Sequence, residues 1–115
     1  MIEKTVLDYL LSKGLTVGEN IFCEVPEKGI PADYILIEKT GSSRENRINQ
    51  AMIAIQSISQ TSLFTAMAMN EEVKEAMDEI VGLPEIFRCE CNSDYNYTNT
   101  ATKEYRYQAV FDLSY

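Results

Sequence analysis

The sequence contains no histidine and no tryptophan, and it has only three cysteines and three prolines. Histidine is the side chain that most often performs general acid–base catalysis, and zinc sites are usually built from cysteine and histidine. The chain also lacks the glycine-rich phosphate loop of nucleotide-binding proteins and the nucleophile elbow of serine hydrolases. These absences predict a protein that is not an enzyme and that holds no metal and no cofactor.

The cysteines are Cys23, Cys89 and Cys91. An odd number in a chain without a secretion signal indicates reduced thiols rather than a disulfide framework. In "FRCEC" the two cysteines share one face of a strand, where a bridge between them is strained. We expect thiols buried in the core, and a thiol enzyme that uses Cys89 or Cys91 stays open only as an alternative.

The net charge is −8, from eighteen acidic and ten basic residues, and the four arginines do not form one block. Electrostatic binding to nucleic acid requires local positive charge, so the sequence predicts a protein that does not bind nucleic acid. The longest uncharged run, residues 48–70, could span a bilayer by length, but ten of its residues are Asn, Gln, Ser or Thr, which predicts no membrane partner. The N-terminal stretch is not typical of a secretion signal, and we expect a cytoplasmic protein.

Hydrophobic periodicity predicts the secondary structure, and the length of 115 residues predicts a single domain over 1–115. The expected order is a helix at 2–13, strands at 20–25, 33–39 and 49–59, a helix at 62–81, and strands at 85–97 and 102–115. Gly14 and Gly82 end the two helices. This order predicts an α+β domain in which an antiparallel or mixed sheet of about five strands carries two amphipathic helices on one face.

The apolar faces of the helices follow from the same periodicity. The first helix is expected to bury Ile2, Val6, Leu7, Leu10 and Leu11. The second is expected to bury Leu63, Ala66, Met67, Asn70, Val73, Met77 and Ile80. The acidic side of the second helix is expected to be a solvated surface, and its methionines to fill the core.

Two segments are expected to be exposed connections. "TGSSRENR", from Thr40 to Arg47, has the glycine, serines and mixed charge of a surface loop, and long loops often carry function. The second segment runs from Asp94 to Thr102, around the polar connection "TNTA" that joins the two strands of the final hairpin. Five of the seven tyrosines fall in that hairpin, where they serve either as a contact surface or as cross-strand pairs that hold the strands together.

Three segments together resemble one protein family. They are the N-terminal helix leading to "VPEKGIPADYILIEKTGSS", the unit "AMIAIQSISQTSLFTAMAMNEEVKEAM", and the closing "NTATKEYRYQAVFDLSY". In this order they are similar to the small tail-terminator or tail-completion (minor tail) proteins of long-tailed bacteriophages and prophages. The resemblance covers most of the chain and lies in hydrophobic pattern with a few fixed polar points.

The resemblance implies a structural virion protein. Such a subunit forms a homo-oligomeric ring, commonly a hexamer, on the head-proximal end of the tail tube, stops tube polymerisation and joins the tail to the head. The implied partners are other copies of the chain, the tail tube protein and a neck or head-completion protein, in the virion and, during assembly, in the host bacterial cytoplasm. The residues expected to make these contacts are Arg44, Glu45, Arg47, Asp94, Tyr95, Tyr97 and Thr102.

Two alternatives stay open beside this one. The first is a head-completion or neck adaptor protein that docks on the portal. Such proteins are also small, acidic and ring-forming, so the sequence does not distinguish this role from that of a tail terminator. A small-molecule-binding regulatory α+β domain belongs to a different class. It predicts a ligand-sized apolar cavity between sheet and helices, whereas a ring subunit predicts a filled core.

Overall fold

The computed structural model describes residues 1–102 and 104–115. The elements, in chain order, are α1 (Ile2–Ser12), β1 (Ile21–Phe22), β2 (Asp33–Glu45), β3 (Ile48–Ser59), α2 (Leu63–Asp78), the 3-10 helix η1 (Ile80–Gly82), β4 (Arg88–Asn96) and β5 (Tyr105–Ser114). The five strands form one sheet in the order β1-β2-β3-β5-β4. Strand β1 runs parallel to β2, and the other neighbours are antiparallel.

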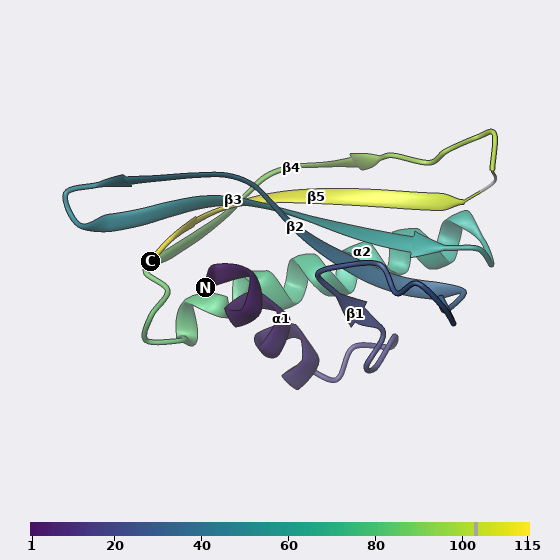
Figure 1. The fold of residues 1–115 in the computed structure, drawn as a ribbon, viewed down its shortest axis with the longest axis horizontal. Helices are drawn as coiled ribbons and strands as arrows, with labels where there is room; N and C mark the ends of the chain where they lie inside the picture. Colours follow the sequence, from purple (N-terminus) through teal and green to yellow (C-terminus); the bar gives the residue numbers. More distant parts are fainter. Residues whose placement is uncertain (103) are drawn as a thin grey trace.

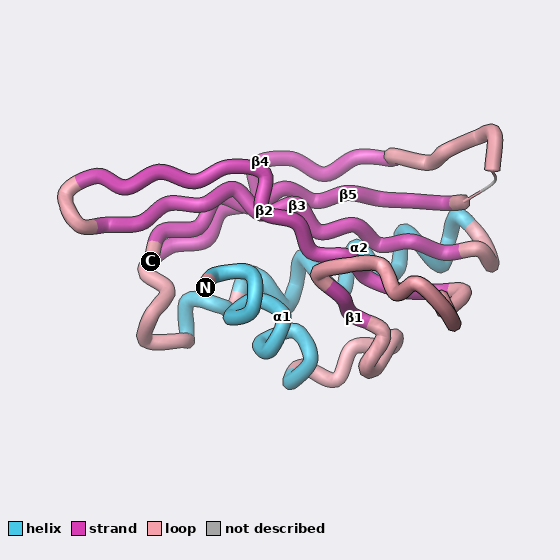
Figure 2. Tube along the Cα trace, viewed as in Figure 1, coloured by secondary structure: helices cyan, strands magenta, loops and turns pink. Residues whose placement is uncertain are grey.

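Both helices lie on the same side of the sheet (Figures 1 and 2). The main core fills the space between them, because alternate residues of β2, β3 and β5 point toward the helices. These inward residues include Ile35, Ile37, Ile53, Ile55, Ala109, Phe111 and Leu113. The prediction of an α+β domain with a five-stranded mixed sheet and two helices is therefore confirmed.

Helix α1 buries a stripe that differs from the predicted one. Tyr9 is buried, whereas Leu11 is 40% exposed. The hydroxyl of Tyr9 donates a 2.6 Å hydrogen bond to the backbone carbonyl of Ala76 in α2, which satisfies both buried groups. A tyrosine whose hydroxyl is hydrogen-bonded can thus occupy the core, although hydrophobicity alone predicts that Leu11 is buried instead. Gly14 follows the helix with φ +68°, as expected of a C-terminal cap.

Helix α2 begins at a conventional cap and also buries a shifted face. The Ser62 hydroxyl accepts a 3.0 Å hydrogen bond from the Thr65 backbone amide, an interaction that typically stabilises a helix by about 1 kcal/mol. Met69 is buried, whereas Met67 is 37% exposed, so the predicted core position of Met67 is wrong. Buried Asn70 completes the stripe and donates a hydrogen bond from its side-chain amide to the Asp94 carboxylate.

The predicted loop from Thr40 to Arg47 is wrong, because most of it is strand. Strands β2 and β3 stay paired as far as Glu45 and Ile48. Only Asn46 and Arg47 form the turn, with φ of 51° and 65°, the positive values that a tight two-residue hairpin requires. The small polar residues 40–43 are exposed, so they lack the hydrophobic alternation that marks a half-buried strand.

We call residues 40–50 the arm. The arm extends beyond the helices at one end of the sheet, so that neither helix covers it (Figure 1). The molecule measures 44 × 26 × 25 Å, and the arm forms one end of the long axis. An extended two-stranded projection buries little apolar surface of its own, which indicates that its side chains are available for contacts outside the monomer.

The final hairpin is antiparallel as predicted, but the first residues of the segment from Asp94 to Thr102 are strand. Asp94, Tyr95 and Asn96 belong to β4, where Asp94 pairs with Ala109 and Asn96 with Tyr107. The prediction that the connection begins at Asp94 is therefore wrong. The connection follows Asn96 and lies at the end of the sheet opposite the arm (Figure 1).

Candidate assembly surface

The predicted contact residues fall into two groups at opposite ends of the molecule. Arg44, Glu45 and Arg47 lie together at the tip of the arm, in and beside the Asn46–Arg47 turn. Asp94, Tyr95, Tyr97 and Thr102 belong to the end of β4 and the connection that follows it. The long axis of the molecule separates the groups (Figure 1), so one partner surface of ordinary size meets only one of them at a time.

The arm tip carries positive charge that the rest of the chain does not neutralise. Among the residues that the structure describes, every lysine and arginine except Lys28, Arg44 and Arg47 lies within ion-pair distance of a carboxylate. Two of these three cations are therefore at the arm tip of a chain whose net charge is −8. A pair of guanidinium groups that is held away from its own acidic body is suited to contact an acidic partner.

The opposite end is tied to the helix layer by polar contacts. The Asp94 carboxylate lies 3.4 Å from the ammonium group of Lys74 and accepts a hydrogen bond from the amide of Asn70, both on α2. The rings of Tyr95 and Tyr97 pack edge to face, with centroids 6.0 Å apart. The hydroxyl of Thr102 donates a hydrogen bond of 3.5 Å to the Asn99 carbonyl. Asp94 therefore positions the strand end, whereas Tyr97 remains 52% exposed.

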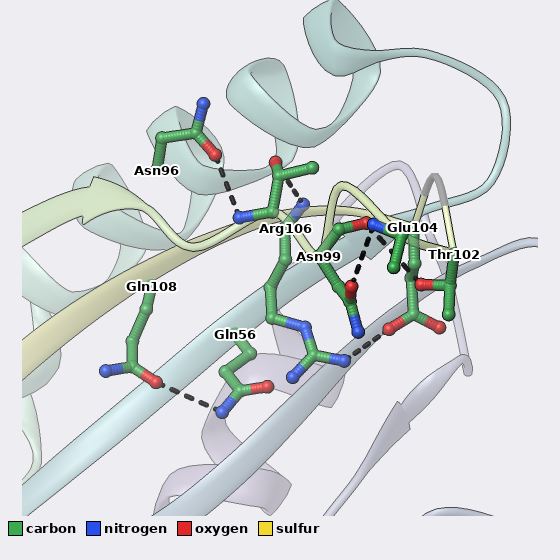
Figure 3. Close-up of polar contacts among 9 residues, drawn as sticks. Gln56, Asn96, Asn99, Thr102, Glu104, Arg106 and Gln108 are labelled. Carbon is green, nitrogen blue, oxygen red and sulfur yellow. Dashed lines mark hydrogen bonds and ion pairs between the residues drawn. The ribbon is translucent and has the colours of Figure 1, made fainter.

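A layer of polar side chains lies on the face of the sheet that carries no helix, and the sequence did not predict it (Figure 3). The Gln56 amide donates a 3.0 Å hydrogen bond to Gln108, whose own amide donates to the Tyr95 hydroxyl. Arg106 bonds Glu104 and lies 5.9 Å from the centroid of the Tyr97 ring. A polar glutamine inside the apolar run "AIQSI" was the only sign of this layer in the sequence.

This polar layer lies beside a small second core. Tyr34, Leu36 and Ile58 are buried on the same face, and Phe22 packs against them with its ring centroid 6.2 Å from that of Tyr34. The register places Gln56 opposite Leu36 and Gln108, and Ile58 opposite Tyr34 and Arg106. This end of the second face is thus closed by its own side chains.

The cysteines differ from their prediction as buried core thiols. Cys23 and Cys91 are exposed, and only Cys89 packs partly against the main core. Burial, together with the nearby Asp78 carboxylate, raises the pKa of the Cys89 thiol from 9.0 to about 12. A thiol nucleophile needs a lowered pKa, so the surroundings of Cys89 oppose the thiol-enzyme alternative.

The raised pKa of Cys89 predicts a loss of stability at alkaline pH. The folded chain holds this proton more tightly than the unfolded chain, so the contribution is complete below pH 9 and is lost as the pH rises toward about 12. Urea unfolding at pH 7 and pH 10.5 should therefore show a smaller alkaline loss for Cys89→Ala than for the unchanged protein. Equal losses in the two proteins would contradict this assignment. Burial also raises the pKa values of the Tyr9 and Tyr34 hydroxyls. Part of the alkaline loss of stability should therefore remain in both the unchanged protein and Cys89→Ala.

Two of the open grooves on the described surface border β2. One, of about 540 Å³, lies at the base of the arm, between Thr40–Ser43, Gln50–Met52, Arg88 and the end of β5. The other, of about 560 Å³, lies between α1 and β2; we call it the edge groove, lined by Met1, Glu3, Lys4, Leu7, Cys23, Ile37, Glu38 and Lys39. Buried side chains fill the space between helices and sheet, and both grooves open to solvent.

Two further findings apply to the described part of the chain. Residues 1–102 and 104–115 contain no group of three or more Cys, Asp and Glu side chains placed to hold a metal ion. Within the same residues, no helix has the length and apolar character needed to cross a bilayer.

Comparison with known proteins identifies the fold. No protein-family model matches the chain, and no curated protein sequence matches it. Among solved structures, the chain is similar to one described as "Virion of native gene transfer agent (GTA) particle". The two share 16% sequence identity with a TM-score of 0.76, over 95% of this chain and 90% of the other. The chain therefore has, over nearly its whole length, a fold that also occurs in a gene transfer agent virion.

Proposed function

We propose that the chain is a structural virion protein, a tail terminator that forms a ring on the head-proximal end of a phage-like tail tube. The observation that carries the proposal is the likeness to a chain of a gene transfer agent virion, which extends over 95% of this chain with a TM-score of 0.76. The resemblance of its sequence to tail-completion proteins supports the same role. A ring in this position ends tube polymerisation and offers a surface to the neck of the head.

The charge of the chain suits a ring through which DNA passes. Six copies at −8 each carry about −48, and a ring with this net charge repels phosphate rather than holding it. The same charge opposes association of free copies, so we expect a monomer in solution that assembles on the tube. A tight hexamer at low concentration and low salt would contradict this part of the proposal.

The arm supports an assembly role more directly than any other feature. It projects from the helix-covered body and holds Arg44 and Arg47 without intramolecular ion pairs among the described residues (Figure 1). A monomer gains little stability from such an extension. A subunit that must reach the tube or a neighbouring subunit requires one, and an acidic neighbour supplies the complementary charge.

A neck adaptor that docks on the portal remains the second candidate, because the same fold and charge suit a ring at the head. A small-molecule-binding domain is less well supported, since the space between sheet and helices is filled by side chains.

The test is electron microscopy of particles from a phage or prophage that encodes the chain, after deletion of this gene alone. Overlong or ragged tubes beside tailless, DNA-filled heads are expected of a missing terminator. Tails of normal length that fail to join heads would identify a neck adaptor instead. Intact infectious particles would contradict both virion roles.

A further inference from the structure

We propose that copies of the chain join side by side through their sheets, with the free edge of β2 on one copy pairing antiparallel with the free edge of β4 on the next. This inference rests on the ring-forming role proposed above and names the seam between its subunits. Five features of the monomer lead to it: two unpaired edges, their matching level, a bulge in each edge strand, a groove beside one edge, and their charge.

Both sides of the sheet have an unpaired edge. Strand β1 pairs only with Ile35 and Leu36, so within the described residues the outer edge of β2 is open from Ile37 to Glu45. Strand β4 is the last strand on the other side, and its outer edge is open from Arg88 to Asn96. Open edges of this length present unpaired backbone amides and carbonyls that a further strand can bond.

The two edges belong to different strands, so pairing between them is head-to-tail. Such a contact repeats from copy to copy and closes into a ring when the rotation per copy allows, whereas pairing an edge with itself stops at a dimer. Strands β2 and β4 run in opposite directions within the sheet, because three antiparallel pairings separate them. Copies arranged with their strands aligned therefore place β2 antiparallel to the neighbour's β4.

The edges also lie at the same level along the strands. One row of the sheet runs from Ser43 through Gln50 and Ser114 to Arg88. A second row runs from Ile37 through Ile55 and Ala109 to Asp94. The segment 88–94 of one copy can thus pair with 37–43 of its neighbour without a shift along the strand direction, as a flat ring requires and a climbing helix does not.

A bulge occurs in each edge strand near the same level. The register of β2 shifts between Lys39 and Gly41, and that of β4 shifts between Cys91 and Ser93. Lys39 and Cys91 occupy opposite ends of one row, through Ile53 and Phe111. Both strands therefore bend in the same part of the sheet, and the bends accommodate each other across the seam.

The edge groove provides room for the incoming strand. It borders Ile37, Glu38 and Lys39 on β2 and is closed on its other side by α1. Side chains of the neighbour's β4 that point toward its helices, such as Cys91, enter this groove when β4 lies along β2. The buried carboxylate oxygen Oε1 of Glu3 beside the groove has no hydrogen-bond partner among the described residues.

Charge favours the seam over most other surfaces of the chain. Along the open edge of β2, from Ile37 to Glu45, Glu38 and Glu45 balance Lys39 and Arg44, for a sum of zero. Strand β4 carries Arg88, Glu90 and Asp94, which sum to −1, whereas the whole chain carries −8. The two edges thus approach with little of the repulsion that separates two copies elsewhere.

The experiment is a disulfide cross-link that uses the natural Cys91. The variant combines Lys39→Cys with Cys23→Ser and Cys89→Ser, so that the two remaining thiols face each other across the seam at the distance of an antiparallel pair. The matched control carries Lys28→Cys in the same background, because Lys28 is exposed and lies in the connection between β1 and β2, outside both of the strands that the seam joins. Each protein is oxidised alone and on purified tail tubes, and non-reducing gels and native mass spectrometry report the products.

The expected result is a ladder of covalent multimers, ending in a closed species without free thiols, for the position-39 variant and not for the control. Oligomers that form without this cross-link would overturn the seam and leave the ring role intact. Equal cross-linking of both variants would overturn it as well, because the contact would then be non-specific. No self-association, either alone or on tail tubes, would overturn the seam together with the proposed function.

Discussion

Neutralising the arm tip should abolish tail capping and leave the monomer folded. Arg44→Gln combined with Arg47→Asn removes both guanidinium groups, and neither group makes an ion pair within the described chain. Asparagine tolerates the positive φ of 65° at position 47. Exposed substitutions of this kind usually change the free energy of unfolding by less than about 0.5 kcal/mol. The tail-length distribution of particles carrying the double variant measures capping.

A matched control separates the site from the total charge. The double variant changes the net charge from −8 to −10, and Lys28→Glu changes it equally from −8 to −10. We expect tubes of uncontrolled length with the double variant and normal tails with Lys28→Glu. Normal tails with both would remove the arm tip from the contact surface, and ragged tails with both would assign the effect to overall charge.

Truncating Phe111 should remove a large part of the free energy of unfolding. Phe111 is 1% exposed, belongs to the main core and lies on β5, which pairs with both β3 and β4. Removal of a buried phenylalanine side chain typically costs about 3–5 kcal/mol, and a domain of this size has about 5–15 kcal/mol in total. We expect the urea midpoint of Phe111→Ala to fall sharply, with a marked loss of soluble protein.

Phe64→Ala is the matched control, because Phe64 at the start of α2 is 78% exposed. It should change the free energy of unfolding by less than about 0.5 kcal/mol. A cost below about 1 kcal/mol for Phe111→Ala would show that the sheet does not depend on this ring for its packing.

The well-buried elements were predictable because their side chains carry a periodic signal. The run Tyr34–Ile37 is buried on both faces, and its unbroken apolar sequence indicates this directly. Helix α2 and the final antiparallel hairpin follow equally from spacing and proximity. The two-residue strand β1 is parallel to β2, and its pairing depends on where the preceding segment returns to the sheet.

The parts that sequence reasoning missed lack such a signal. The arm is a strand without a buried face, so residues 40–45 present only turn-like composition. Tyr9 and Met69 enter the core in place of Leu11 and Met67, because a helix rotates by a fraction of a turn to satisfy specific contacts. Arg44, Glu45 and Arg47 were predicted to lie together because they are close in the chain. They do lie together in the structure, at a hairpin tip rather than in a loop.

The polar layer on the open face could not be predicted residue by residue. Gln56 and Gln108 are far apart in sequence, and only the pairing of β3 with β5 brings their amides together (Figure 3). Gln56 is buried and Gln108 is half-buried, and a buried amide is favourable only when a partner is present, so this hydrogen bond favours the observed register of β3 and β5.

The central claim is that the chain forms a ring at the head-proximal end of the tail, and cryo-electron microscopy of purified particles tests it most directly. Particles should carry a peptide tag inserted at Gly29, in the exposed connection between β1 and β2, and a gold-labelled antibody against it. The account predicts label at the junction of tail and head, around a ring whose density accepts the monomer with its arm against a neighbour. Label at the distal tip of the tail, along the tube, or inside the capsid would contradict it.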